Sequence, residues 1–225
     1  VRSAVIFDAC HGESTSGTPL LPRLRAIARE ADLPVCGGAG MGFINLPTGC
    51  VASFYPAAHL KPGGISLIAH SGSVFTVLAM NDPRYRFDLI VSPGQEIGAT
   101  LDEYIDYAVA RPTTKVIAVF METARNPQGF MASLRRARAA GKPVVVCKVG
   151  RSEESARMAQ SHTGALAGSR AAYDAAIAAC GAISVGTVDE LMNVAQLCAG
   201  GRKPGRGGVG LVTASGGLRE LAMDC

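Results

Sequence analysis

The chain has 225 residues, of which 48% are hydrophobic and 18% charged, and its formal net charge is +4. This length predicts one large domain or two small ones. The longest apolar runs, such as Val116–Met121, fall far short of the ~18 residues that a membrane-spanning helix needs, which argues against a membrane protein. The mild charge, 5% aromatic content and lack of tryptophan argue against a nucleic-acid-binding protein.

The cysteine pattern indicates neither a disulfide framework nor a metal site. The seven cysteines are Cys10, Cys36, Cys50, Cys147, Cys180, Cys198 and Cys225. Their number is odd, none forms a CxxC pair, and no histidine stands at metal-ligand spacing. We therefore expect no metal ion, and we interpret cysteines within apolar runs as small buried hydrophobes. Reduced thiols predict a cytoplasmic protein.

Residues 1–58 predict about half of an α/β domain. The expected elements are a strand over Ala4–Phe7, a helix over Leu20–Ala31, and strands over Leu33–Cys36 and Val51–Tyr55. A glycine-rich segment, Gly37–Gly42, separates the last two strands.

Residues 59–199 predict one complete α/β domain. Five short apolar runs alternate with helix-like stretches; the runs are Ile65–Ala69, Phe87–Val91, Val116–Met121, Val144–Val149 and Ala182–Val185. Because these runs do not alternate with polar residues, they suit strands that are covered on both faces. The pattern predicts an α/β fold with a doubly wound parallel sheet.

Helix boundary signals support this division. Thr100 is placed to cap a helix with acidic residues in its first turn, and Pro127 stands near the start of another. Residues 200–208 form a basic glycine-rich linker. Residues 209–225, with an expected strand over Val209–Ala214, predict the start of a third α/β domain, so the chain is expected to be a piece of a longer protein.

The segment Ala69–Ser73 joins a predicted strand to a predicted helix. In a doubly wound sheet ligands bind at this edge, where Gly72 permits close backbone approach and the helix N-terminus favours an anion. Ser71 and Ser73 add hydroxyl groups. The competing interpretation is that Ser71 merely caps the helix.

A single histidine, His162, lies among small residues in Gln160–Ser169, after a charged helical stretch over Ser152–Ala159. A neutral imidazole serves as a base, a metal ligand or a phosphoryl acceptor. The alternative is a solvated loop histidine.

Glu122 follows the strand Val116–Met121 at the same edge of the sheet, where its carboxylate could orient an imidazole. A solvated glutamate is an equal alternative. For His11 and Glu13 we favour no function.

Four segments, in this order, carry a resemblance to a known family: Ser71-Gly72, Glu122, Lys148–Ser152 and Ser161–Gly168. Together they resemble the nucleoside-diphosphate-forming acyl-CoA synthetases. These include ADP-forming acetate–CoA ligase and are related to the α subunit of succinyl-CoA synthetase. The resemblance implies that residues 59–199 are a flavodoxin-like phosphohistidine domain. Residues 1–58 would be the end of a Rossmann-like CoA-binding domain.

The resemblance also implies the reaction. A carboxylic acid, CoA and ATP (or GTP) would give acyl-CoA, ADP (or GDP) and phosphate, through an acyl phosphate and a phosphohistidine. His162 would accept the phosphoryl group, Glu122 would orient it, and Ser71, Gly72, Ser73, Thr163 and Gly164 would bind the phosphate. Mg²⁺ would accompany the nucleotide, which an ATP-grasp domain or subunit outside this chain would bind. Family members form homo- or hetero-oligomers, and this piece alone would be inactive.

Five positions, in three segments, depart from the family pattern. Gly38, Ala39 and Gly40 replace Pro-Asn-Cys, in a loop whose candidate CoA and acyl-site residues are Gly40, Met41, Gly42 and Asn45. Gln95 stands where Asn is commoner, and His70 stands where relatives often have Gln. The glycine substitution is consistent with a different acid substrate.

Two other classes of function remain open from the sequence. One is a non-catalytic relative that senses CoA or a nucleotide, as in the regulatory region of protein acetyltransferases. The other is a flavodoxin-like binding module without catalysis. The presence of His162 favours the synthetase.

Overall fold

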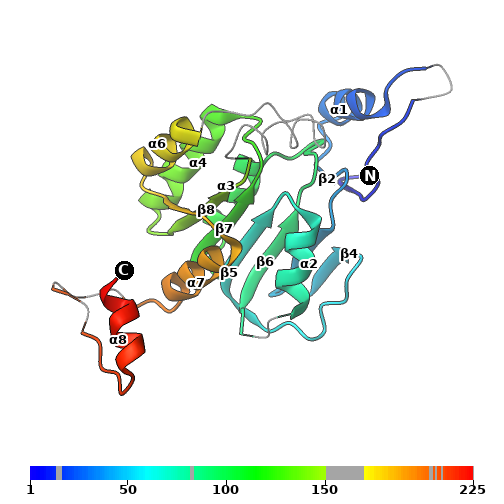
Figure 1. Cartoon of the computed structure of the whole chain (residues 1–225). Helices are drawn as coiled ribbons and strands as arrows, with labels where there is room; N and C mark the ends of the chain where they lie inside the picture. Colours follow the sequence, from blue (N-terminus) through cyan, green and yellow to red (C-terminus); the bar gives the residue numbers. More distant parts are fainter. Residues whose placement is uncertain are drawn as a thin grey trace.

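The computed structural model describes residues 1–13, 17–81, 84–150, 170–202, 205, 207–208 and 210–224. Within these ranges, a seven-stranded sheet has the order β4-β3-β6-β5-β7-β8-β9 (Figure 1). Five of its strands are parallel: β5 (Pro62–Ala69), β6 (Phe87–Ser92), β7 (Val116–Met121), β8 (Val144–Lys148) and β9 (Ile183–Val185). Their spatial order, taken in chain order, is 2-1-3-4-5, the order of flavodoxin-like sheets. The predicted α/β class and the five strands are confirmed.

Helices cover both faces of the sheet. On one face α2 (Gly72–Asn81) and α7 (Val188–Ala199) pack in a core with side chains such as Leu67 and Ala118. On the other face lie α3 (Leu101–Ala110), α4 (Pro127–Ala139) and α6 (Arg170–Ala179), packed around Ile68 and Val119. Successive strand residues therefore enter different cores, which explains why the strands are apolar without alternation.

Two antiparallel strands extend this sheet at one edge. They are β3 (Gly42–Asn45) and β4 (Cys50–Ser53), and β3 pairs with β6 so that Gly42 lies opposite Ser92 and Asn45 opposite Leu89. The sequence predicted a strand near β4 but not β3 and not its pairing with β6. A domain boundary at residue 58 stays a prediction, and residues 42–53 are hydrogen-bonded into the same sheet as residues 62–185.

The first segment forms a smaller layer beside the main sheet. Strands β1 (Ala4–Ile6) and β2 (Val35–Gly37) are parallel, and α1 (Leu20–Glu30) connects them. Ala28 of α1 and Val35 of β2 share a buried cluster with Ile97, which comes from the loop after β6. This contact fixes α1 against the loop at the carboxyl end of β6.

Two helices begin at the boundary residues that the sequence predicted. The Glu103 carboxylate accepts a hydrogen bond from the Thr100 backbone N–H at 2.7 Å, and Pro127 is the first residue of α4. Asn126 caps α4, since its Oδ1 accepts from the Gly129 N–H at 3.0 Å. Cys147 is buried as predicted, whereas Cys50 is exposed.

The strand predicted over Val209–Ala214 is wrong. Described residues 210–214 form no strand, and they have no paired strand beside them within the described parts of the chain to satisfy their backbone groups. The exposed helix α8 (Gly216–Met223) follows, capped by Ser215, whose Oγ accepts from the Leu218 N–H at 3.3 Å. The helix predicted over Ser152–Ala159 lies outside the described residues. No helix among those described is long and apolar enough to cross a bilayer.

Candidate functional site

From β5 the chain continues to β6 on one side of it and then to β7 on its other side. The position between β5 and β7 is therefore the topological switch point, where ligands bind in such sheets. Ala69 at the end of β5 lies opposite Phe120 of β7, and the His70 N–H donates to the Phe120 carbonyl at 3.0 Å. The residues that follow the two strands, Ser71 and Glu122, therefore meet at one edge. This is the edge at which the sequence predicted a site.

The turn at residues 71–73 begins helix α2. Ser71 Oγ accepts a hydrogen bond from the Val74 N–H at 3.3 Å, so Ser71 does cap the helix. The amides of Gly72 and Ser73 lie in the first turn, where no intrahelical acceptor exists. Capping and anion binding are compatible here, because the cap satisfies one amide and leaves two in the first turn.

Gly72 packs closely against Met41. A Cβ added to Gly72 would lie 2.5 Å from Met41 Cε, closer than two carbons can approach. Met41 belongs to the glycine-rich loop, so the candidate phosphate turn and the candidate CoA loop are in contact. The sequence proposed these two segments separately, and the fold brings them together.

The glycine substitutions in that loop allow close backbone contacts with the loop after β6. A Cβ on Gly40 would lie 2.3 Å from the Ser92 carbonyl oxygen. The Gly38 carbonyl accepts from the Gln95 N–H at 2.7 Å. The side chains of Pro-Asn-Cys would not fit this arrangement unchanged, because at Gly40 the added Cβ meets backbone rather than a flexible side chain.

Asn45 does not join these residues. It lies opposite Leu89, near the amino end of β6, and its Oδ1 accepts from Arg111 Nη2 at 3.1 Å. Gly42, at the other end of β3, is opposite Ser92 and stays with the glycine-rich loop.

His70 is the site residue whose role the sequence missed, although its substitution for Gln was visible. Its side chain is buried, and Nδ1 accepts the Glu122 backbone N–H at 3.1 Å. Because a backbone N–H can only donate, the proton of the neutral ring is on Nε2, which lies 3.2 Å from Glu96 Oε1. His70 thus connects the main chain at Glu122 to the carboxylate of Glu96.

Glu96 was also missed, since nothing in its sequence context distinguishes it from a surface loop residue. Its φ is 52° and its side chain is fully buried. Oε1 accepts the Leu101 N–H at 2.6 Å, at the start of α3, and Oε2 lies 3.2 Å from Arg125 Nε without forming a hydrogen bond. A buried carboxylate on a left-handed backbone is the kind of strained feature found at functional sites.

Two neighbouring side chains extend this cluster. Gln95 is buried, and its side-chain Nε2 lies 3.4 Å from His11 Nε2. The backbone carbonyl of Gln95 accepts a hydrogen bond from Arg25 Nη2 at 2.8 Å. Lys148, at the end of β8, is buried and its Nζ lies 4.8 Å from the centre of the Tyr173 ring. The carboxyl edge thus carries charged and polar groups from β5, β6, β7 and β8.

The remaining predicted residues, His162, Thr163 and Gly164, lie outside the described residues. The described residues that precede them can be located. Lys148, two residues before Gly150, lies opposite Met121, which precedes Glu122. Glu122 itself is half-buried.

Comparison with known proteins gives a consistent family. Residues 62–198 match the family model described as succinyl-CoA ligase like flavodoxin domain. The chain is 33% identical to acetate–CoA ligase (ADP-forming) I of Archaeoglobus fulgidus over 229 residues, which cover 100% of this chain and 33% of that protein. It is 31% identical to trans-feruloyl-CoA synthase FCS1 from an unknown prokaryotic organism, covering 99% of this chain and 32% of that protein. The chain therefore spans about a third of the length of these relatives.

A solved structure is similar to this chain as well. The dinucleotide forming acetyl-coenzyme A synthetase 1 of Ca. Korarchaeum cryptofilum, in complex with phosphate and ADP, is similar with a TM-score of 0.78 and 25% identity. The match covers 88% of this chain and 43% of that one.

Proposed function

Since this chain belongs to the succinyl-CoA ligase like flavodoxin domain family, we propose that it is the phosphoryl-transfer part of an acyl-CoA synthetase. The relatives are ADP-forming CoA ligases. The proposed overall reaction joins a carboxylic acid to CoA and converts ATP or GTP to ADP or GDP and phosphate. An ATP-grasp domain or subunit outside this chain would bind the nucleotide with Mg²⁺.

The observation that carries the proposal is the composition of the switch point. It combines the N-terminus of α2 at Gly72 with Glu122, which follows β7. In the sequence, His162 lies between β8, which ends at Lys148 at this edge of the sheet, and α6, which begins at Arg170. A helix N-terminus stabilises the negative charge of a phosphoryl group. A phosphohistidine near residues 71–73 would have this stabilisation available.

His162 is the preferred phosphoryl acceptor because it lies in the family-like motif and because two other histidines are badly placed. His59 Nε2 lies 2.9 Å from the carbonyl of Ala79, near the C-terminal end of α2, whereas the proposed phosphate turn is at the N-terminus of that helix. His70 is buried, and both its nitrogens have partners. The fourth histidine, His11, is exposed, and its substitution is the control for that of His162 in the experiment below.

In the proposed step, a neutral ring nitrogen of His162 attacks phosphorus of an acyl phosphate. The N–P bond forms as the bond between phosphorus and the acyl oxygen breaks, which releases the carboxylate. Glu122 would accept a hydrogen bond from the other ring nitrogen and so hold the attacking nitrogen unprotonated. The reverse sequence makes the acyl phosphate, and CoA then displaces phosphate from it.

The contact of Met41 with Gly72 is what supports a CoA role for the glycine-rich loop. It puts Gly40–Gly42 beside the turn at which we propose phosphate binds. When bound, CoA would supply the thiol that takes the acyl group. The loop's own contribution would be to position the acyl phosphate between itself and α2.

The test is labelling of the intact protein that contains this chain. After incubation with ATP labelled at the γ-phosphate, wild type should carry acid-labile, alkali-stable phosphate, His162→Ala none, and the matched variant His11→Ala the wild-type amount. Persistent label in His162→Ala would contradict the assignment, as would a wild type that never acquires label. CoA binding without labelling would favour the sensing relative instead.

A further inference from the structure

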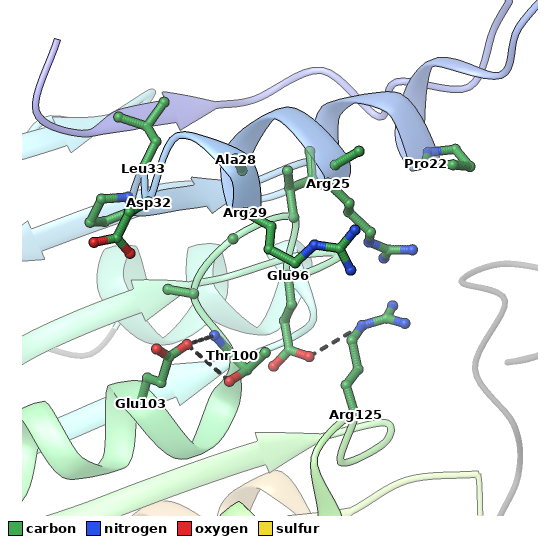
Figure 2. A pocket seen from close by; sticks show the side chains of 15 residues that line it. Pro22, Arg25, Ala28, Arg29, Asp32, Leu33, Glu96, Thr100, Glu103 and Arg125 are labelled. Atoms are coloured by element: carbon green, nitrogen blue, oxygen red, sulfur yellow. Dashed lines mark hydrogen bonds and ion pairs between the residues drawn. The ribbon is translucent and has the colours of Figure 1, made fainter.

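A cavity of about 720 Å³ lies between α1 and the loop that follows β6. Arg25 and Arg29 reach it from one face of α1, where they are one turn apart, and Arg125 reaches it from the segment between β7 and α4. Figure 2 shows the guanidinium groups of these three residues gathered at one end of the cavity. We call Arg25, Arg29 and Arg125 the arginine cluster.

The arginine cluster forms fewer ion pairs than it has guanidinium groups. In the described ranges, Glu96 is the only carboxylate that forms an ion pair with any of the three, at 3.2 Å from Arg125 Nε. That carboxylate also accepts from His70 and from the Leu101 N–H. Asp32 and Glu103 also line the cavity, but among the described residues neither forms an ion pair with the cluster, so one shared carboxylate is paired with three guanidinium groups.

The positive charge of Arg125 acts on Arg25. Its guanidinium is half-buried, and burial together with the positive charge of Arg125 lowers the pKa of Arg25, against an opposing effect of Glu96. The two arginines come from elements one hundred positions apart, so the fold itself brings the like charges together. An oxyanion between them would remove this repulsion.

The rest of the cavity has apolar walls and two further carboxylates. Ala28, Leu33, Pro34 and Ile97 supply apolar lining, and Asp32 and Glu103 also line it, the Glu103 carboxylate accepting from the Thr100 N–H. Small-molecule sites commonly have volumes of roughly 300–1,000 Å³ and apolar walls with a few polar anchors. The cavity is therefore larger than inorganic phosphate needs, and its three guanidinium groups lie at one end, whereas Asp32 and Glu103 lie away from them (Figure 2).

We propose that the arginine cavity binds the phosphate groups of a nucleotide-sized ligand, at residues different from those of the α2 turn. Phosphate fits better than a carboxylate because its oxygens point in several directions and accept from guanidinium groups on separate elements. ADP and CoA share a diphosphate and are the two sources to distinguish. The proposal does not depend on phosphorylation of His162.

The experiment maps arginine reactivity in the intact protein. Phenylglyoxal modifies accessible guanidinium groups, and mass spectrometry gives the rate at each position, with inorganic phosphate, ADP or CoA present or absent. We expect at least one of the three to slow the modification of Arg25 and Arg125 about fivefold or more, through charge-assisted hydrogen bonds. Arg23, exposed on α1 outside the cavity, should react at an unchanged rate.

The variants Arg125→Gln and Arg23→Gln provide the matched pair. Arg125→Gln should abolish the protection of Arg25, whereas Arg23→Gln should preserve it. Protection by ADP alone or CoA alone identifies the source, and protection by all three shows that the phosphate group suffices. Equal rates with and without every ligand would overturn the proposal, and so would protection of Arg25 that survives in Arg125→Gln. Neither result bears on labelling at His162.

Discussion

Two buried polar clusters lie at opposite ends of the same parallel strands, and they differ in how completely their atoms are paired. At the amino end, Asp88 accepts from Arg111 Nε at 2.6 Å, from Arg111 Nη2 at 3.0 Å and from Thr114 Oγ1 at 2.6 Å. At the carboxyl end, the Oε2 of Glu96 and the Oε1 of Gln95 are buried without a hydrogen bond among the described residues. The first cluster is complete and the second is not.

The difference separates structure from function on physical grounds. A buried carboxylate whose hydrogen bonds are all made needs no further partner, and removing one member of such a pair destabilises the fold. Buried polar atoms left without partners carry a free-energy cost of about 1–3 kcal/mol each, which a ligand or a moving segment can remove. We therefore assign the Asp88 cluster to stability and the His70–Glu96 cluster to the site.

The largest expected effect is on stability, at the complete cluster. Asp88→Ala would leave the Arg111 guanidinium buried without its carboxylate, and breaking such a pair costs about 3–5 kcal/mol. We expect this loss in the free energy of unfolding, measured by urea titration. A loss below about 1 kcal/mol would show that Arg111 finds another partner and that the cluster is dispensable.

The same carboxyl group predicts a pH dependence. Burial by itself raises the pKa of Asp88, but hydrogen bonds from Arg111 and Thr114 and the charge of Arg111 outweigh it, so the pKa lies below its ordinary value. A carboxyl with a lowered folded pKa contributes stability above the unfolded pKa of about 3.9, and that contribution is lost as pH falls toward the folded pKa. Wild type should therefore lose more stability below about pH 4 than Asp88→Asn does. Identical pH profiles would contradict this account.

The next effect concerns the incomplete cluster, where a change should alter the site more than the fold. His70→Leu removes the acceptor for the Glu122 N–H, so we expect faster hydrogen exchange of that amide and about 10-fold slower labelling at His162, as for a misplaced group. His70→Gln should restore both, because its Oε1 can accept from Glu122 and its Nε2 can donate to Glu96.

Hydrogen exchange keeps this prediction testable even if the protein forms no phosphohistidine. A Glu122 amide that exchanges at the wild-type rate in His70→Leu would show that His70 does not hold it. Equal losses in His70→Gln and His70→Leu would point instead to a requirement for the imidazole itself.

The sequence predicted the strands well because each signal was local. Val116–Met121 is a continuous apolar run with boundaries that the structure reproduces, and Pro127 marks the start of α4 correctly. Strand β3 was missed because its glycine-rich start resembles a loop, and its pairing with β4 and β6 makes it a strand. The strand expected over Val209–Ala214 failed for the converse reason, since β propensity without a partner strand is insufficient.

The site was predictable only in part. Ser71 and Glu122 follow strands, so their edge of the sheet could be inferred from the topology of any parallel fold. Glu96 and Arg125 could not be inferred, because each depends on contacts between elements far apart in sequence. Asn45 was grouped with the CoA loop by proximity in sequence, whereas an antiparallel strand carries it to the opposite end of β6.

A smaller effect tests why Gly72 is a glycine. Gly72→Ala would force Met41 to move, and because Met41 is flexible we expect a cost of about 1 kcal/mol in unfolding free energy. The double variant Gly72→Ala with Met41→Ala should recover the part of the cost due to this clash, apart from the loss that Met41→Ala causes alone. Strictly additive losses would show that the two residues do not interact.

The smallest effect is expected at an exposed pair with the same chemistry as Asp88 and Arg111. Arg136 binds Asp106 through two hydrogen bonds, from Nε at 2.8 Å and from Nη2 at 2.6 Å, but both side chains are exposed. Water replaces these bonds when the pair is broken, so Asp106→Ala should cost only about 0.2–1 kcal/mol in urea unfolding, and less at high salt. Since both pairs are bidentate, the difference between Asp88→Ala and Asp106→Ala gives the combined contribution of burial and of the additional hydrogen bond from Thr114. Equal losses would mean that bidentate geometry, rather than burial, makes the amino-end cluster stabilising.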